Sequence, residues 1–279
     1  MTSLLEEGVP TERRARRVTP GRRVIGLSFI LLTVVALGPI GYMAVESVRS
    51  SSGSAWTLSN WARLFHTLPI LTGLGNSAIL AVSSSLLTVV VTASAGFAFA
   101  KLPFRGARII LIAVIVSLAL PLIADIVPEF LDWAHYGLVG SYLPPIIVYS
   151  AFNAAFAVIF FTNFFLHIPD EFIESAISEG AGYGRVLVQI VLPMALPALV
   201  TIAVFDFMLV WNDLLVALIF LPQQNHQTVS VLLATINSAH VVHTQELLAG
   251  ALLSVVPNLL VFLGLQRYLL LGFSVGVEK

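Results

Sequence analysis

The sequence predicts an all-α membrane protein with six transmembrane helices. Of its 279 residues, 58% are hydrophobic and 10% are charged, whereas a soluble domain carries about 25% charged residues. Uncharged apolar runs recur along the chain, and each is about as long as the ~20 residues that a helix needs to cross a bilayer. Composition therefore argues against a water-soluble enzyme. The absence of cysteine excludes disulfides and thiol catalysis.

The first predicted helix covers residues 24–45 and follows a basic tail at 1–23. Its apolar run is longer than the ~7–15-residue core of a signal peptide, and no small-x-small cleavage site follows it. We therefore interpret it as a membrane span. Five further spans are expected at 77–100, 109–127, 142–166, 198–221 and 247–271. The six spans form one transmembrane domain over 24–271, and a tail at 272–279 follows it.

The third predicted span is interrupted, because Pro121 and Pro128 flank Asp125. Proline lacks a backbone N–H and bends a helix. In a membrane such breaks are tolerated where protein or a water-lined cavity satisfies the freed groups. We expect a broken helix in which Asp125 either lines a solute pathway or has a structural role.

Basic residues predict the orientation. Every Lys and Arg except Arg49 and Arg63 lies in the N-terminal tail, after the second or fourth span, or near the end of the sixth. Because cytoplasmic segments retain Lys and Arg, we expect a multi-pass protein of the cell membrane with both termini in the cytoplasm.

The segment 168–197, between the fourth and fifth spans, predicts two short cytoplasmic helices. Pro169-Asp170 favours a helix start. Apolar residues then repeat on one helix face, at Phe172, Ile173, Ala176 and Ile177. Glycines next permit a sharp turn, at Gly180, Gly182 and Gly184. A second helix is expected from about Arg185 until Leu192-Pro193 ends it. The apolar face either packs beneath the protein's own spans or binds a groove of a partner.

Part of this segment resembles a known signature. Glu174-Ser175-Ala176, Glu179-Gly180-Ala181 and Ile190-Val191-Leu192-Pro193 are similar to the EAA motif of permease subunits in binding-protein-dependent ABC importers. The spacing agrees, and the two departures are small: Ser175 replaces an alanine and Glu179 an aspartate.

Two further motifs resemble the MalG-type permeases of carbohydrate importers. These are Trp211-Asn212-Asp213-Leu214-Leu215 in the fifth span and Gln266-Arg267-Tyr268-Leu269 near the end. The C-terminal residues Phe273–Lys279 follow that group's ending only loosely.

The resemblance implies the fold of an ABC importer permease that moves a sugar, polyol or sugar-phosphate inward by alternating access. It also implies four kinds of partner: a different, MalF-like permease, two copies of a cytoplasmic ATPase, an extracytoplasmic solute-binding protein and the carbohydrate. No nucleic acid is expected. Lys101 and Lys279 both lie outside any Gly-x-x-x-x-Gly-Lys-Ser/Thr sequence, so ATP and Mg²⁺ are assigned to the ATPase. This chain is expected to bind no cofactor and to catalyse no reaction.

The resemblance further implies that the EAA helices dock into a cleft of the ATPase. The residues carried over to this coupling role are Glu174, Ser175, Ala176, Glu179, Gly180, Ala181, Gly184, Arg185, Leu192 and Pro193. In the C-terminal tail, an ATPase contact is assigned to Ser274, Gly276 and Lys279.

Asp206 and Asp213 are the candidates for a polar solute path in the fifth span. Seven residues separate them, so they share one helix face at roughly 10 Å. A carboxylate at mid-membrane costs about 2.5–3.5 kcal/mol on insertion scales, so both should face protein or water. Trp211, Asn212 and Asp125 join this candidate set. The alternative is structural, with Asn212 and Asp213 capping or hydrogen-bonding a bent helix.

Two other function classes were weighed. A proton-coupled secondary transporter could use Asp206 or Asp213, but such folds often contain internal repeats and none is evident. An intramembrane protease is disfavoured because no His-Glu-x-x-His occurs and no span supplies a histidine partner for a serine. His240 and His243 could share a metal ion, yet nearby loop histidines are usually solvated, so no metal site is assigned.

Overall fold

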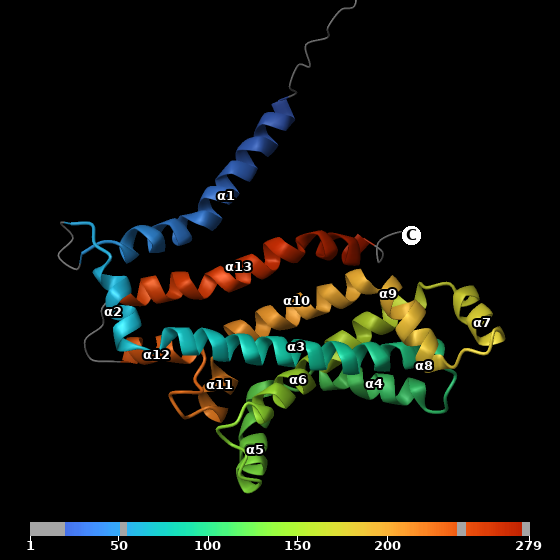
Figure 1. Cartoon of the computed structure of the whole chain (residues 1–279). Helices are drawn as coiled ribbons and strands as arrows, with labels where there is room; N and C mark the ends of the chain where they lie inside the picture. The colour runs from blue at the N-terminus through green and yellow to red at the C-terminus, as the bar shows by residue number, and fades with distance from the viewer. Residues whose placement is uncertain (1–19, 51–54, 239–243, 275–279) are drawn as a thin grey trace, which may run out of the picture.

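The computed structural model describes the backbone of residues 20–50, 55–238 and 244–274 and the side chains within 25–50, 55–236 and 244–268. Within these residues the chain is helical, without strands other than one isolated bridge between Arg49 and Trp56. The described helices (Figure 1) are α1 (Pro20–Ser47), α2 (Ser59–Thr67), α3 (Ile70–Lys101), α4 (Ala107–Ser117), α5 (Leu122–His135), α6 (Leu143–Leu166), α7 (Asp170–Ser178), α8 (Tyr183–Val186), the π-helix η1 (Leu187–Val191), α9 (Leu192–Met194), α10 (Leu196–Asn212), α11 (Leu215–Phe220), α12 (Val229–Ser238) and α13 (Thr244–Ser274). The predicted all-α fold is confirmed.

The long helices α3, α6, α10 and α13 form an elongated bundle (Figure 1). α3 packs most extensively against α6 and next against α10. Its buried face consists largely of small side chains, among them Ser84, Ser85, Thr88, Thr92, Ala93 and Gly96. A Cβ atom on Gly96 would lie 2.6 Å from the Cβ of Phe161 on α6. Small residues of this kind let membrane helices approach one another closely.

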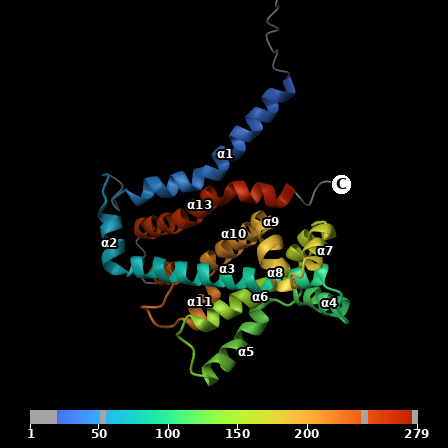
Figure 2. The ribbon, with the colours of Figure 1, turned by 45° about the vertical axis from the view of Figure 1, so that its right-hand side comes forward.

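α1 diverges from this bundle and touches it mainly through α13 (Figure 2). None of the most apolar part of Ile25–Ser47 is buried within the chain, and side chains such as Leu31 and Val35 are nearly two-thirds exposed. This apolar surface is therefore free to contact lipid or another membrane subunit.

Four described helices are long and apolar enough to cross a membrane unaided, and the number rises to six if each of two bent helix pairs counts as one span. The four are α3, α6, and the segments Ile25–Ser47 of α1 and Thr244–Tyr268 of α13. They include the predicted first, second, fourth and sixth spans, and α3 begins seven residues earlier than expected, at Ile70.

The third predicted span, 109–127, is interrupted, as the prolines predicted. α4 has 11 residues and measures about 16 Å, which is short of the ~30 Å hydrocarbon core. The chain then turns by 101° into α5, which lies crosswise to the bundle (Figure 1). Pro121 has extended backbone (ψ 130°) at this turn, so the predicted proline break is present. Pro128 lies inside α5.

The fifth predicted span, 198–221, is also interrupted. α10 ends at Asn212, Asp213 has extended backbone (ψ 138°), and α11 begins at Leu215. At its other end α10 is bent by 79° from the segment Tyr183–Met194.

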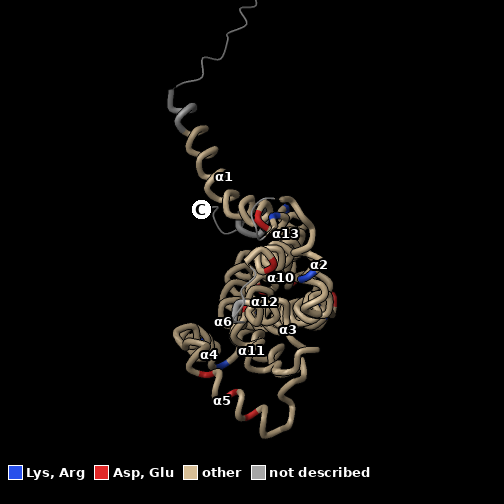
Figure 3. The backbone as a smooth tube through the Cα atoms, turned by 90° about the vertical axis from the view of Figure 1, so that its left-hand side faces the viewer, with Lys and Arg blue, Asp and Glu red and all other residues tan. Residues whose placement is uncertain are grey.

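The two ends of the bundle contain different short helices. Figure 1 shows α7 and α8 at one end and α2 and α12 at the other. Seen along the bundle, most of the backbone belongs to uncharged residues (Figure 3). The buried hydrophobic side chains form two separate clusters accordingly. The cluster near α7 contains Phe97, Phe161, Phe165, Ile173, Val186 and Val191. The other contains Leu64, Ile70, Trp211, Phe220 and Leu232.

Candidate coupling and transport sites

The α7–α8 hairpin is closed by a backbone motif that accounts for the small residues of the EAA signature. Gly180 is left-handed (φ 88°). Its N–H donates to the carbonyl of Ile177 at 2.9 Å, and the N–H of Ala181 donates to that of Ala176 at 2.9 Å. This pair of bonds is the Schellman arrangement, which glycine favours because it has no Cβ. Both alanines are half-buried and pack against the cluster near α7.

The rest of the predicted hairpin needs correction. Gly182 has φ −76° and Gly184 lies inside α8, so neither supplies the left-handed turn. The second helix begins at Tyr183, two residues before Arg185. Leu192-Pro193 does not end it, since α9 continues to Met194. Between α8 and α9 runs the five-residue π-helix η1, a feature that often accompanies functional sites.

The predicted apolar face of α7 divides between two environments. Ile173 is 5% exposed and joins the cluster near α7, and Ala176 packs beside it. Phe172 and Ile177 are 50% and 36% exposed. Phe172 and Ile177 lie about 140° apart around the helix, on either side of Ile173 and Ala176. The centre of the face therefore packs beneath the protein's own helices, and its two edges are exposed. Other residues of the hairpin with exposed side chains are Glu174, Ser175, Glu179, Tyr183 and Arg185.

Lys101, which is not among the predicted site residues, lies against α7. Its Nζ donates to the carbonyl of Ile168 and to Oδ1 of Asp170, both at 2.6 Å. Its side chain is 5% exposed, whereas that of Asp170 is 72% exposed. A signal was present: Lys101 ends a long apolar run, but a basic residue there was read only as a marker of orientation.

Asp206 lies inside the bundle and not on an open surface. It is 1% exposed. Thr88 Oγ1 on α3 donates to its Oδ2 at 3.2 Å, and Asn153 on α6 donates to its Oδ1. The carboxylate of α10 thus binds both neighbouring helices. Trp211 is likewise buried, at 2% exposure, and its Nε1 donates to the carbonyl of Ser254 at 3.0 Å.

Asp213 caps the helix after the break. Its Oδ1 accepts hydrogen bonds from the N–H of Val216 at 2.9 Å and from the hydroxyl of Tyr149 at 2.8 Å. Asn212 is exposed, donates to the carbonyl of Met208, and accepts a bond from Asn258 at 3.1 Å. This geometry is the structural alternative that the sequence left open.

Asn212 and Asp213 also border open space. An open hollow of about 490 Å³ is lined by Phe205, Met208, Leu209, Asn212 and Asp213. The structural and pathway interpretations are therefore compatible at these two positions, but Asp206 does not line this hollow.

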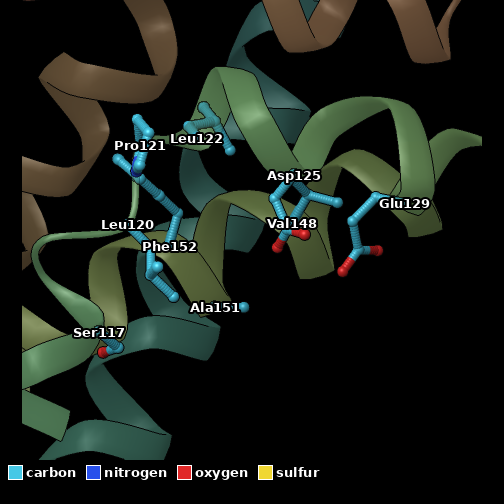
Figure 4. Close-up of a pocket in the computed structure, with 9 residues that line it drawn as sticks. All are labelled: Ser117, Leu120, Pro121, Leu122, Asp125, Glu129, Val148, Ala151 and Phe152. Carbon is cyan, nitrogen blue, oxygen red and sulfur yellow. The ribbon is translucent and has the colours of Figure 1, made fainter.

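Asp125 lies in a cavity of about 160 Å³ at the break between α4 and α5 (Figure 4). The residues around it are Ser117, Leu120, Pro121, Leu122, Asp125, Glu129, Val148, Ala151 and Phe152. Asp125 and Glu129 are one helical turn apart and direct their carboxylates to the same side. Glu129 accepts a bond from Trp133 Nε1 at 3.1 Å. The sequence analysis did not select Glu129, although its spacing from Asp125 predicts a shared face.

The remaining predicted residues lie at or beyond the described limits. Ser274 is the last residue of α13. Gly276, Lys279, His240 and His243 lie outside the described residues. Among the residues that the structure describes, no three His, Asp or Glu side chains gather as metal ligands would.

A membrane-length helical bundle with interrupted helices and a two-faced hairpin at one end defines an integral membrane transport subunit. Residues 91–272 match the family described as "Binding-protein-dependent transport system inner membrane component". Because this match covers more than half of the chain, the protein belongs to that family. The resemblance to ABC importer permeases is thereby confirmed, and the proton-coupled alternative gains no support.

Similar proteins agree with this assignment. The osmoprotective compounds uptake permease protein GgtD of Synechocystis sp. is 32% identical over 73% of this chain and 69% of its own length. The diacetylchitobiose uptake system permease protein NgcG of Streptomyces coelicolor is 29% identical over 92% of this chain and 90% of its own length. A solved bacterial ABC transporter that imports the acidic polysaccharide alginate has a chain with TM-score 0.78 and 22% identity, covering 90% of this chain and 98% of that one. The latter confirms the predicted ABC importer permease fold.

Proposed function

We propose that this chain is the permease subunit of an ATP-driven importer for a carbohydrate or a related polyol or sugar-phosphate. The observation that carries the proposal is on α7, where the exposed Ile177 and Glu174 are neighbours one turn apart on the helix surface. Phe172, also exposed, lies at the other edge of the apolar face. An apolar helix face with an acidic neighbour fits a groove of a partner protein. The printed function of NgcG, diacetylchitobiose uptake, supports a carbohydrate as the solute.

The partners follow from this assignment. Two copies of a separate ATPase bind ATP and Mg²⁺, and the α7 hairpin docks into a cleft of one of them. This chain therefore binds no cofactor and is not itself the catalyst. A second, different permease completes the pathway, and the exposed apolar surface of α1 supports such a contact. An extracytoplasmic binding protein delivers the solute to the end formed by α2 and α12.

In this proposal the chain is oriented with α7 toward the cytoplasm and with both termini on the cytoplasmic side. The chain contains no cysteine, so single cysteines introduced by Glu179→Cys and Arg63→Cys report each end separately. In intact cells a membrane-impermeant maleimide should label the variant at position 63 and spare the one at 179. The opposite pattern would invert the orientation and remove the docking role of α7.

Transport proceeds by alternating access between two conformations whose populations the partners shift. Closure of the ATPases displaces the α7 hairpin, and the packed segment from Val186 to Ala195 passes this displacement to α10. Val186, Val191 and Ala195 are all fully buried, so the segment moves as a unit. Asp206 keeps α10 attached to α3 and α6 as they reorient.

The solute contacts assigned within this proposal are the two open polar surfaces. Asp125 and Glu129 border the cavity at the α4–α5 break, and Asn212 and Asp213 border the hollow along α10. Carboxylates and amides accept hydrogen bonds from hydroxyl groups. Trp211 and Asp206 hold α10 from behind these surfaces.

The test is a charge reversal on α7. In proteoliposomes containing the complete transporter, Glu174→Lys should reduce ATP-dependent sugar uptake by about tenfold, because a charge-assisted contact of about 1.5–3 kcal/mol becomes repulsive. The same substitution at Glu171, also exposed on α7 but outside the motif, is the matched control and should retain most uptake. Normal uptake by Glu174→Lys, or uptake that needs a proton gradient and no ATPase, would overturn the proposal.

A further inference from the structure

We propose that Lys101 is a positioning residue that ties the coupling helix α7 to the end of α3, so that displacement of α7 is transmitted to the central bundle through this bond. The inference rests on the proposed function for the docking of α7 on an ATPase. It adds a second mechanical connection, through α3, to the covalent one that runs through η1 and α9 to α10.

The bond is built on a buried cation. Lys101 is the last residue of α3, and its side chain is 5% exposed. Its Nζ lies 2.6 Å from the carbonyl oxygen of Ile168, just before α7, and 2.6 Å from Oδ1 of Asp170, the first residue of α7. A lysine that only marked the cytoplasmic side would extend into water, as long cationic side chains usually do.

The neighbouring basic residues provide the contrast. Arg105 and Arg108 follow in the same segment and are exposed. Within the described residues the two ion pairs are Lys101–Asp170 and Arg49–Glu46, and the second joins residues three apart on one turn. Of these two ion pairs, Lys101–Asp170 is the one that joins segments distant in the sequence. A buried ammonium without partners is strongly unfavourable. We therefore expect Lys101 to keep its two bonds, so that the start of α7 moves together with the end of α3.

α7 has few other links to the membrane helices. It packs mainly against α8, and Ile173 is its buried contact with the cluster near α7. α3, in contrast, is the most connected helix of the bundle, because it packs against α6 and α10. Thr88 on α3 donates to Asp206 on α10. A displacement that reaches the end of α3 therefore reaches both helices.

The two partners of Lys101 are unequal, which predicts an order of effects. The carbonyl of Ile168, a 7% exposed residue, cannot be replaced by a side-chain change, whereas the Asp170 side chain is 72% exposed. Removing the cation breaks both bonds. Removing the Asp170 charge leaves the bond to Ile168 in place. A swapped pair with an acid at 101 can restore only the bond to residue 170, because the carbonyl oxygen of Ile168 accepts and does not donate.

The experiment measures uptake and ATP hydrolysis together in the reconstituted transporter. Lys101→Gln should lower the number of solute molecules moved per ATP by about tenfold, since a charged hydrogen bond is lost. Asp170→Asn should lower it less, and Lys101→Arg should preserve most of it. Arg108→Gln is the matched control and should behave as wild type. A wild-type ratio in Lys101→Gln would overturn the inference.

A direct readout separates transmission from simple loss of stability. Ser94→Cys on α3 and Ser178→Cys on α7 lie at exposed positions of a cysteine-free chain, and spin labels there report the distance between the two helices. In the assembled transporter Lys101→Gln should broaden that distance distribution, and Lys101→Arg should not. An unchanged distribution would overturn the inference even if transport fell. If Glu174→Lys abolishes uptake while Lys101→Gln is silent, the inference alone fails; if Glu174→Lys is silent, the proposed function fails.

Discussion

The α7–α9 segment and the α4–α5 segment both interrupt the bundle, but they are built in opposite ways. The first turns on a bonded left-handed glycine and covers a core in which Val186, Val191 and Ala195 are fully buried. The second turns at a proline, α4 contains no buried residue, and in α5 only Ile126 is buried. A cavity with two carboxylates adjoins the second turn.

The difference teaches how a broken helix can serve two purposes. A break that is sealed by packed side chains behaves as a rigid corner, since a close-packed interior transmits displacement. A break that lacks such packing leaves polar groups accessible to a solute. The first suits the coupling role and the second the transport role proposed above.

The largest expected effect tests the close packing of α3 against α6, within the buried cluster near α7. Gly96→Val should lower the free energy of unfolding by about 3 kcal/mol, because overpacking a tight contact costs about this much and the new Cβ would lie 2.9 Å from the backbone nitrogen of Thr162. Gly75→Val on the same helix, with no atom within 4 Å of its Cβ, is the control. Thermal unfolding of the purified protein in detergent measures both. Equal loss in the two variants would mean that α3 and α6 are not closely packed.

A smaller effect is expected at the break between α10 and α11, where Asp213 caps α11. Asp213→Ala should destabilise α11 by about 1–2 kcal/mol, the usual value of a lost helix cap, because Val216 and Tyr149 both lose their acceptor. Asp213→Asn keeps an acceptor oxygen and should lose less. Hydrogen exchange of the amides in 215–220 is the measurement, and unchanged protection in the alanine variant would contradict the capping role.

The next effect is a loss of stability at the turn of the α7–α8 hairpin. Gly180→Ala should cost about 1 kcal/mol, since a Cβ is unfavourable at positive φ and Gly180 has φ 88°. Gly182→Ala should cost little, because φ there is −76°. Hydrogen exchange across 170–178 compares the two, and equal protection would show that the hairpin does not depend on this turn.

The smallest effect tests the cavity. Asp125→Asn should raise the KM for uptake by about fivefold with little change in kcat, as expected when one hydrogen bond of about 1 kcal/mol is weakened. Asp132→Asn, an exposed change on the same helix, should leave KM unaltered. A KM that does not respond to Asp125→Asn would remove the cavity from the pathway.

The sequence predicted the helical class, the four long helices and the hairpin, because each depends on local patterns of apolar residues, proline and glycine. It did not predict the course of the third span, since the direction taken after Pro121 depends on the packing of α5. It also could not separate the apolar residues of α7 that are buried from those that are exposed. That division depends on where Phe161 and Phe165 of α6 lie, and periodicity alone does not encode it.

The site was predicted less completely than the fold, for a similar reason. Asp206 was recognised as a costly charge that must avoid lipid, and it does so, but through Thr88 and Asn153, which lie 118 and 53 residues away in the chain. Lys101 was missed because its partner is 69 residues further on. Such pairings become visible only when the helices are placed side by side.

The half-exposed Phe172 and Ile177 have a consequence for how the transporter is made. In a chain without a partner at α7 these apolar side chains stay uncovered, and exposed apolar surface favours aggregation. A partner that covers these two side chains would remove that liability, so the assembled subunit is expected to be less prone to aggregation than the free one.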